Sequence, residues 1–273
     1  MEPELELGRL AVVGAGKMGT TLLRAWLGAG VVRPAQVIAT ARHQARIEQV
    51  ARELGIEATL DNRQAVASAD TILLGVKPQG AAEVLAELAP VLRPGQMVIS
   101  ILASVSTGYI EERLPAPVAV VRVMPNTPSL IGAGMSGVCG GRHAREGQLA
   151  VVKRLFESLG RAMVLDEKYF DAVTGLSASG PAFVYIIIES LAEGGVKAGL
   201  PRAIATELAA QTCLGAARMV IETGDHPAVL KDAVTTPAGC TIDGILKLEE
   251  GGLRVTLIKT VVEATRRAGE LVQ

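Results

Sequence analysis

The chain has 273 residues, of which 49% are hydrophobic and 20% charged, and its net charge is −1. This length and apolar content suffice for one large or two medium globular domains with a sizeable core. The near-neutral charge, without a run of Lys or Arg, excludes the electrostatic footprint of a nucleic-acid-binding protein. We therefore expect small-molecule chemistry and no nucleic-acid partner.

Targeting, membrane and metal signals are weak throughout the chain. Residues 1–6 are acidic and lack the basic start of a secretory signal. The longest strongly apolar stretch in the second half, 181–188, is shorter than the ~20 residues of a membrane span. The three cysteines are widely spaced and the three histidines form no cluster, so neither a metal site nor a disulfide framework is expected. These features predict a soluble, cytoplasmic protein.

A glycine-rich turn follows a short apolar run, 10–13, and precedes an amphipathic helix expected at 20–27. Its residues are Gly14, Ala15, Gly16, Lys17, Met18 and Gly19. In such a turn the first glycine permits the tight bend, the second admits a pyrophosphate, and the third lets helix and strand pack closely. Free N–H groups at the helix N-terminus favour the same anion. This context predicts a dinucleotide site; the spacing by itself also fits a βα turn without a ligand.

The residues after the second expected strand, 36–40, concern cofactor choice. NAD-binding domains place an acid here for the adenosine ribose hydroxyls, but this chain has Thr40 and Arg42, with Arg46 one turn later. A hydroxyl and guanidinium groups suit a 2′-phosphate, which a carboxylate would repel. We predict NADP as the cofactor, with NADPH favoured and NADH possible. The alternative is that both arginines are solvated charges at a helix start.

The first part of the chain alternates strands with helices. Further strands are expected at 58–60, 71–76, 97–101, 118–123, 135–139 and 162–165, and helices at 44–54, up to 67, 80–88, 107–113 and 145–159. The segment 71–76 is apolar throughout, which is typical of a parallel-sheet strand buried on both faces. The pattern predicts an α/β fold with a Rossmann-like dinucleotide-binding domain over residues 1–165.

Polar residues follow two of the expected strands. Val76, Lys77 and Pro78 end the strand at 71–76, and Asn126 lies in a proline-stiffened loop after the strand at 118–123. Open α/β sheets bind ligands at the carboxyl ends of their strands. We interpret Lys77 and Asn126 as ligand contacts, against the alternatives of a surface lysine and a rigid turn without a ligand.

From residue 166 the alternation stops, and a helical domain is expected over 166–273. Its helices are expected at 170–176, 181–197, 201–222, 230–234, 241–249 and 253–271. Pro181, with Ser179 or Gly180 before it, indicates a capped helix start. The segment 184–188 is apolar on all sides, and a small helical domain can rarely bury such a helix alone. We therefore predict a homodimer with helices of both subunits packed together.

A loop at 235–241 precedes the helix expected at 241. The residues that could bind a ligand are Thr235, Thr236, Gly239, Cys240 and Thr241. Hydroxyls and free backbone N–H groups at a helix N-terminus suit a small anion, and a carboxylate is the natural candidate. The alternative is an ordinary helix start with Thr241 as its N-cap.

Four stretches give the chain its resemblance to the pyrroline-5-carboxylate reductase family. They are GAGKMG, VKP at 76–78, DAVTGLSASGPAF at 171–183 and TTPAGCTIDG at 235–244. The resemblance covers residues 10–271. It implies NAD(P)H as hydride donor, L-1-pyrroline-5-carboxylate as substrate and L-proline as product, in the last step of proline biosynthesis. It also implies dimers formed by interlocked helical domains, often assembled into larger rings.

The resemblance also implies roles for particular residues. The glycine turn would hold the pyrophosphate, Thr40 and Arg42 the adenosine ribose or its phosphate, and Val76 to Pro78 the nicotinamide half. Thr236, Gly239 and Thr241 would bind the substrate, with Thr241 near the imine nitrogen as a possible proton relay. The chain has Thr at 235 and 236 where Ser is usual, and Cys240, interpreted as a small filler, where alanine is usual.

Three other functions remain as alternatives. A β-hydroxyacid dehydrogenase shares the two-domain plan, but it pairs its catalytic lysine with an asparagine one turn later, where this chain has Pro201 after Lys197. A reductase of another cyclic imine would use the same motifs. A non-catalytic dinucleotide sensor would share the fold, because fold does not determine function.

Overall fold

The computed structural model describes residues 7–115 and 117–270, which separate into two compact units. One unit runs to Ser179 and also takes in the chain from Glu263, and the other is Gly180–Val262. The last strand ends at Val164, so the change from alternation to helices lies where the sequence indicates it. The compact units divide later than the expected domain boundary at 165–166, because the first helical turns after Val164 pack with the sheet.

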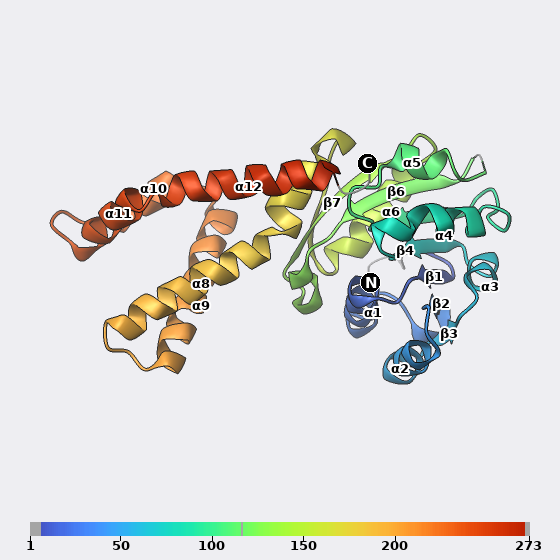
Figure 1. Cartoon of the computed structure of the whole chain (residues 1–273), viewed down its shortest axis with the longest axis horizontal. Helices are drawn as coiled ribbons and strands as arrows, with labels where there is room; N and C mark the ends of the chain where they lie inside the picture. Colours follow the sequence, from blue (N-terminus) through green and yellow to red (C-terminus); the bar gives the residue numbers. More distant parts are fainter. Residues whose placement is uncertain (1–6, 116, 271–273) are drawn as a thin grey trace. The chain divides into compact units, whose positions relative to one another are not determined.

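Within the described residues, the first unit holds one sheet of eight strands in the order β3-β2-β1-β4-β5-β6-β7-β8 (Figure 1). The strands are β1 Leu10–Val13, β2 Val37–Thr40, β3 Glu57–Thr59, β4 Thr71–Leu74, β5 Met97–Ser100, β6 Ala119–Met124, β7 Gly134–Gly140 and β8 Gly160–Val164. Neighbouring strands are parallel except β6 and β7, which are antiparallel. The short connection between β6 and β7 explains this, because a parallel crossover needs a dozen or more residues. The expected Rossmann-like domain is confirmed.

Helices cover both faces of the sheet. They are α1 Lys17–Gly28, α2 Gln44–Leu54, α3 Asn62–Ala67, α4 Ala81–Leu88, α5 Thr107–Glu111 and α6 Glu146–Glu157. Alternate residues of β1 enter different clusters: Val12 packs with Trp26 of α1, and Val13 packs with Leu85 of α4. Trp26 meets the Phe156 ring edge-on at 5.3 Å, and its Nε1 donates to the Leu155 carbonyl at 3.0 Å. These contacts tie α1, which begins at the glycine turn, to α6.

The helix expected at 181–197 is confirmed to within one residue, but the capped start expected before Pro181 is wrong. Helical structure continues from α7, Phe170–Val173, through a π-helical turn at Thr174–Ala178 into α8, Gly180–Lys197. Pro181 has no N–H, so the Ser177 carbonyl four residues earlier lacks its usual partner. The side-chain Nδ2 of Asn126 donates to that carbonyl at 3.2 Å. A donor from outside the helix therefore lets the helix pass through the proline, and no cap is needed.

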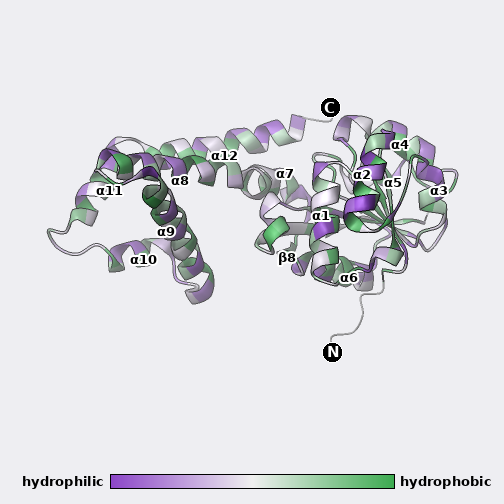
Figure 2. Cartoon of the chain, turned by 90° about the horizontal axis from the view of Figure 1, so that it is seen from below, coloured by the Kyte–Doolittle hydropathy of each residue, from purple (hydrophilic) through white to green (hydrophobic). Residues whose placement is uncertain are grey.

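The second unit is helical and leaves much apolar surface uncovered within one chain. It contains α8, α9 Arg202–Thr223, α10 Pro227–Ala233, α11 Cys240–Glu250 and the first part of α12, Leu253–Glu270. Ala192, Ala205 and Ala209 form a small buried cluster between α8 and α9. Apolar residues nevertheless face outward on these helices (Figure 2). Tyr185 and Ile186 are both 61% exposed, so the segment 184–188 is not buried by its own chain.

Candidate dinucleotide and anion sites

A pocket of about 370 Å³ lies at the carboxyl ends of β1, β2 and β4. It is lined by Gly14, Ala15, Gly16, Ala41, Arg42, His43, Arg46, Gly75, Val76 and Lys77. The strand order reverses between β1 and β4, and open α/β sheets bind ligands at such a switch point. The pocket therefore brings together residues predicted from three separate segments, and adds Ala41, His43 and Gly75, which carry no signal of their own in the sequence.

The three glycines of the turn have different surroundings. Gly14 has φ +95°, and a β-carbon there would lie 2.8 Å from Val76 Cγ1. A β-carbon at Gly19 would lie 2.8 Å from the Gly14 carbonyl oxygen. At Gly16 it would meet no heavy atom within 4 Å, so the fold itself does not require glycine there. The open space above Gly16 fits a pyrophosphate drawn close to the backbone, as the motif predicts.

Thr40 supports the turn from behind. It is 1% exposed, its carbonyl accepts from Ala15 N at 2.6 Å, and its hydroxyl accepts from Gly14 N at 3.2 Å. The hydroxyl donates to Asn62 Oδ1 at 2.7 Å. Thr40 is not among the residues that line the pocket, so the structure gives it a supporting role, and its contact with the ribose or its phosphate stays a prediction.

The two arginines after β2 differ in their contacts. Arg46 is half-buried, and its guanidinium donates to the Ala15 carbonyl at 3.0 Å, to Thr20 Oγ1 at 2.8 Å and to Gln49 Oε1 at 2.9 Å. Arg42 is exposed, and its guanidinium has no hydrogen bond or ion pair with any described residue. A β-carbon at Gly80 would lie 3.1 Å from Arg42 Nη2, so this cation reaches the segment after β4. The whole Arg42 guanidinium is available for a phosphate group, whereas each nitrogen of Arg46 already donates one hydrogen bond within the protein.

Of the remaining residues predicted to bind the cofactor, some line the pocket and others do not. Lys77 is exposed in the pocket and its ammonium group has no partner in the described part of the chain. Lys17 and Pro78 are chain neighbours of lining residues, whereas Met18 and Gly19 lie further along α1, and Met18 packs against the core. An electrophile or anion in the pocket would therefore meet the Lys77 amine but not the Met18 side chain.

Asn126 lies outside the pocket and is 8% exposed. Its Oδ1 accepts from Met135 N at 2.9 Å, and its Nδ2 donates to the Ser177 carbonyl at 3.2 Å. Both ends of the amide are therefore used within the protein. The side chain links the β6–β7 connection, β7 and the π-helical turn, and the predicted cofactor contact stays a prediction.

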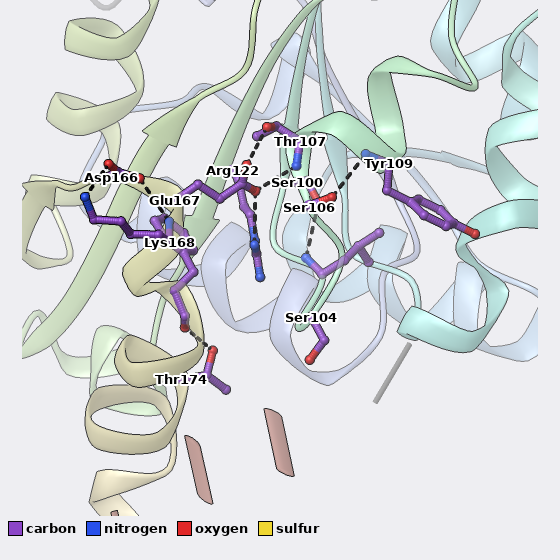
Figure 3. A network of polar contacts seen from close by, with 12 residues as sticks. Ser100, Ser104, Ser106, Thr107, Tyr109, Arg122, Asp166, Glu167, Lys168 and Thr174 are labelled. Atoms are coloured by element: carbon purple, nitrogen blue, oxygen red, sulfur yellow. Dashed lines mark hydrogen bonds and ion pairs between the residues drawn. The ribbon is translucent and has the colours of Figure 1, made fainter. Parts of the chain in front are cut away.

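A buried ion pair was missed by the sequence analysis (Figure 3). Arg122 of β6 is 4% exposed, and its Nη1 donates to Glu167 Oε1 at 3.0 Å. Glu167 also accepts from the Thr107 N–H at 2.7 Å and from its hydroxyl at 2.6 Å. The Arg122 guanidinium lies 4.8 Å from the Phe170 ring centre. The signal that could have found this pair is an arginine inside the apolar strand 119–124.

The loop at 235–241 in the second unit has the features of an anion site. The helix α11 begins at Cys240 with Gly239 as its N-cap, which has no side chain to occupy the first N–H groups. Thr241 therefore lies inside the first turn, and the alternative that it serves as N-cap is wrong. Thr235 Oγ1 donates to the Lys231 carbonyl at 2.8 Å, and Gly239 N donates to the Thr236 carbonyl at 3.0 Å. The Thr241 hydroxyl has no hydrogen bond with any described residue.

Two family models match the chain. Residues 167–271 match pyrroline-5-carboxylate reductase dimerisation, and residues 9–104 match a model described as NADP oxidoreductase, coenzyme F420-dependent. The helical run Glu167–Lys197 is long and apolar enough to cross a membrane, judged by length and composition alone. Within this chain, 6% of its most apolar window is buried. That run falls inside the stretch matched to the dimerisation model.

Relatives match along nearly the whole chain. A pyrroline-5-carboxylate reductase of Methanosarcina acetivorans is 41% identical over 98% of this chain and 99% of its own. The reductase of Glycine max is 41% identical over 96% of this chain and 95% of its own. The solved reductase structure from Coxiella burnetii has a TM-score of 0.89 at 32% identity, over 98% of this chain and all of that one. A Plasmodium falciparum pyrroline carboxylate reductase solved with NADP bound has a TM-score of 0.89 at 29% identity, over 98% and 99%.

Proposed function

Because the chain belongs to the pyrroline-5-carboxylate reductase family, we propose that it reduces L-1-pyrroline-5-carboxylate to L-proline with NADPH, the last step of proline biosynthesis. The observation that carries the proposal is the start of α11, where Gly239 leaves the first N–H groups uncapped beside the unengaged Thr241 hydroxyl. A dinucleotide sensor has no use for such an anion site. The substrate carboxylate is an anion of the right size and charge for it.

The pocket of the first unit fits NADP. The open space at Gly16 receives the pyrophosphate, and the Arg42 guanidinium pairs with the 2′-phosphate. Val76, Lys77 and Pro78 follow β4 at the place where the nicotinamide half is expected. NADPH, when bound, supplies the hydride for the imine carbon. The Lys77 ammonium group is exposed in this pocket, and the catalytic contribution we assign to it is to attract the anionic substrate by its positive charge.

The substrate loop holds and orients the substrate. The N–H groups of Cys240 and Thr241 bind the carboxylate, with Thr235 and Thr236 shaping the loop around Gly239. The Thr241 hydroxyl donates a hydrogen bond to the imine nitrogen. A threonine hydroxyl is a poor acid, so a neutral imine needs a proton relayed from water through Thr241 Oγ1, whereas an iminium needs none.

The test is the loss of nicotinamide absorbance when the purified protein meets pyrroline-5-carboxylate with NADPH or NADH. Rapid oxidation, faster with NADPH, is expected. Thr241→Ala should lower kcat/KM about tenfold or more, since one hydrogen bond to a developing charge is lost. Thr223→Ala, at the end of α9 and outside the loop, is the matched control. If the protein binds NADPH but does not oxidise it in the presence of any imine, the result contradicts the proposal and favours the sensor.

The dimerisation domain matched at 167–271 implies a homodimer. We propose that the dimers assemble further into a ring, as the resemblance implies, and that the protein acts in the cytoplasm. Three free cysteines among the described residues are compatible with a reducing compartment. Sedimentation at micromolar concentration distinguishes a monomer, a dimer and a larger ring, and a monomer would count against the assembly.

A further inference from the structure

The Ala15 carbonyl is held by a closed set of three hydrogen bonds. Arg46 Nε donates to it at 3.0 Å, and Thr20 Oγ1 donates to it at 3.1 Å. Arg46 Nη2 donates in turn to Thr20 Oγ1 at 2.8 Å. Thr20 is 3% exposed and lies on α1, whereas Arg46 comes from α2. Two helices therefore fix one peptide group of the glycine turn.

That peptide group joins Ala15 to the open position at Gly16, and its own N–H, that of Gly16, donates to the Gly14 carbonyl at 2.8 Å. An anion is bound by a glycine turn only when N–H groups face it, because a carbonyl oxygen turned the same way repels it. The bonds from Arg46 and Thr20 keep the Ala15 oxygen occupied within the protein. The third guanidinium nitrogen, Nη1, donates to Gln49 Oε1 at 2.9 Å, so each nitrogen of Arg46 donates within the protein, and one N–H on Nη1 and one on Nη2 are left.

We propose that Arg46 is a positioning residue for the dinucleotide site, keeping the Ala15 carbonyl oxygen away from the pyrophosphate, and that it does not read the 2′-phosphate. This inference rests on the proposed use of NADP(H) and divides the work of two arginines in one pocket. Arg42 contacts the group that distinguishes NADPH from NADH. Arg46 shapes the turn that both cofactors share, so it contributes equally to the affinity for either.

The experiment measures dissociation constants of NADPH and NADH by titration calorimetry on the full-length dimer, without imine substrate. Arg46→Lys keeps the charge but cannot make the planar fork, so it should weaken both cofactors about tenfold and leave their ratio within twofold. Thr20→Val, nearly isosteric, should show the same pattern. Arg42→Gln should weaken NADPH about tenfold more than NADH. Arg52→Gln, exposed near the end of α2 and outside the pocket, is the matched control and should change neither.

Two results would overturn the proposal. A selective loss of NADPH affinity in Arg46→Lys or Arg46→Gln would make Arg46 a phosphate ligand. Wild-type affinity for both cofactors in Arg46→Lys, with Thr20→Val also unaffected, would show that the turn needs neither side chain. Far-UV circular dichroism and the urea midpoint of each variant separate these effects from unfolding. If the wild-type protein bound neither NADPH nor NADH, the proposed function would be overturned, and with it the positioning role of Arg46.

Discussion

Arg122 and Glu167 lie 45 positions apart in the chain and form an ion pair of 3.0 Å between Nη1 and Oε1. The arginine is in the middle of the apolar strand β6, and the glutamate opens the region matched by the dimerisation family model. Glu167 also takes both donors of Thr107 at the start of α5. One carboxylate therefore joins the sheet, α5 and the first helical turns that follow β8.

Removing this carboxylate should destabilise the protein. Glu167→Ala leaves the Arg122 guanidinium buried without a counter-charge, which should cost about 2 to 3 kcal/mol of stability. The cost is smaller than for a fully buried pair, because Glu167 itself is partly exposed. Urea unfolding measures the loss. Glu157→Ala breaks the exposed pair with Lys153 and should cost less than about 0.5 kcal/mol. If the two variants lost the same free energy of unfolding, the Arg122–Glu167 pair would contribute no more to stability than an exposed pair.

The second and third glycines of the turn should respond differently to alanine. Gly16→Ala meets no atom of the protein, so its urea midpoint should be unchanged while NADPH affinity falls about tenfold or more. Gly19→Ala places a β-carbon 2.8 Å from the Gly14 oxygen and should lower stability by about 1 to 3 kcal/mol. Calorimetric binding with parallel urea unfolding checks both. Full NADPH affinity in Gly16→Ala would remove the pyrophosphate from this place.

Cys139 should make stability fall at high pH. Burial, followed by the charge of Glu167, raises the pKa of the Cys139 thiol from 9.0 to about 12. The folded protein keeps this proton while the unfolded chain loses it above about pH 9, so the free energy of unfolding falls by about 1.4 kcal/mol per pH unit between about pH 9 and 12. Below about pH 9 the thiol is protonated in both the folded and the unfolded state, so its full contribution to the free energy of unfolding is present.

Urea unfolding at pH 8 and pH 10.5 tests this titration. The difference in stability between wild type and Cys139→Ala should shrink by about 2 kcal/mol at the higher pH, because the variant lacks the group. Wild type and Cys139→Ala are compared at both pH values in the same buffer, so the other groups of the protein contribute to both. If the Cys139→Ala difference were constant, the thiol would have an ordinary pKa in the folded protein.

Asn126 and Pro181 should be coupled through the Ser177 carbonyl. Asn126→Val removes the donor to this carbonyl and the acceptor for Met135 N, which should cost about 2 to 4 kcal/mol. Pro181→Ala restores an N–H four residues after Ser177. The double variant should recover about 1 kcal/mol of the loss in a double-mutant cycle followed by urea unfolding. Strict additivity would show that the proline and the asparagine do not share this carbonyl.

The sequence by itself determined the order and type of the elements and the place of the cofactor turn. Helix α2 has the bounds expected for it, and α4 and β5 differ by one residue at one end, because apolar periodicity and turn residues are local signals. The glycine spacing and the loop at 235–241 are local as well. These motifs identified the family before any contact was known.

Only the tertiary structure decided which polar groups are free to meet a ligand. Thr40, Arg46 and Asn126 are engaged by partners 26, 31 and 51 positions away, whereas Arg42 and Thr241 are not. The partner of Arg122 is equally distant, because Glu167 lies 45 positions further along the chain. A residue type indicates which bonds a side chain can make, but a hydrogen bond within the protein uses that capacity, and its partner is known only when the chain is folded.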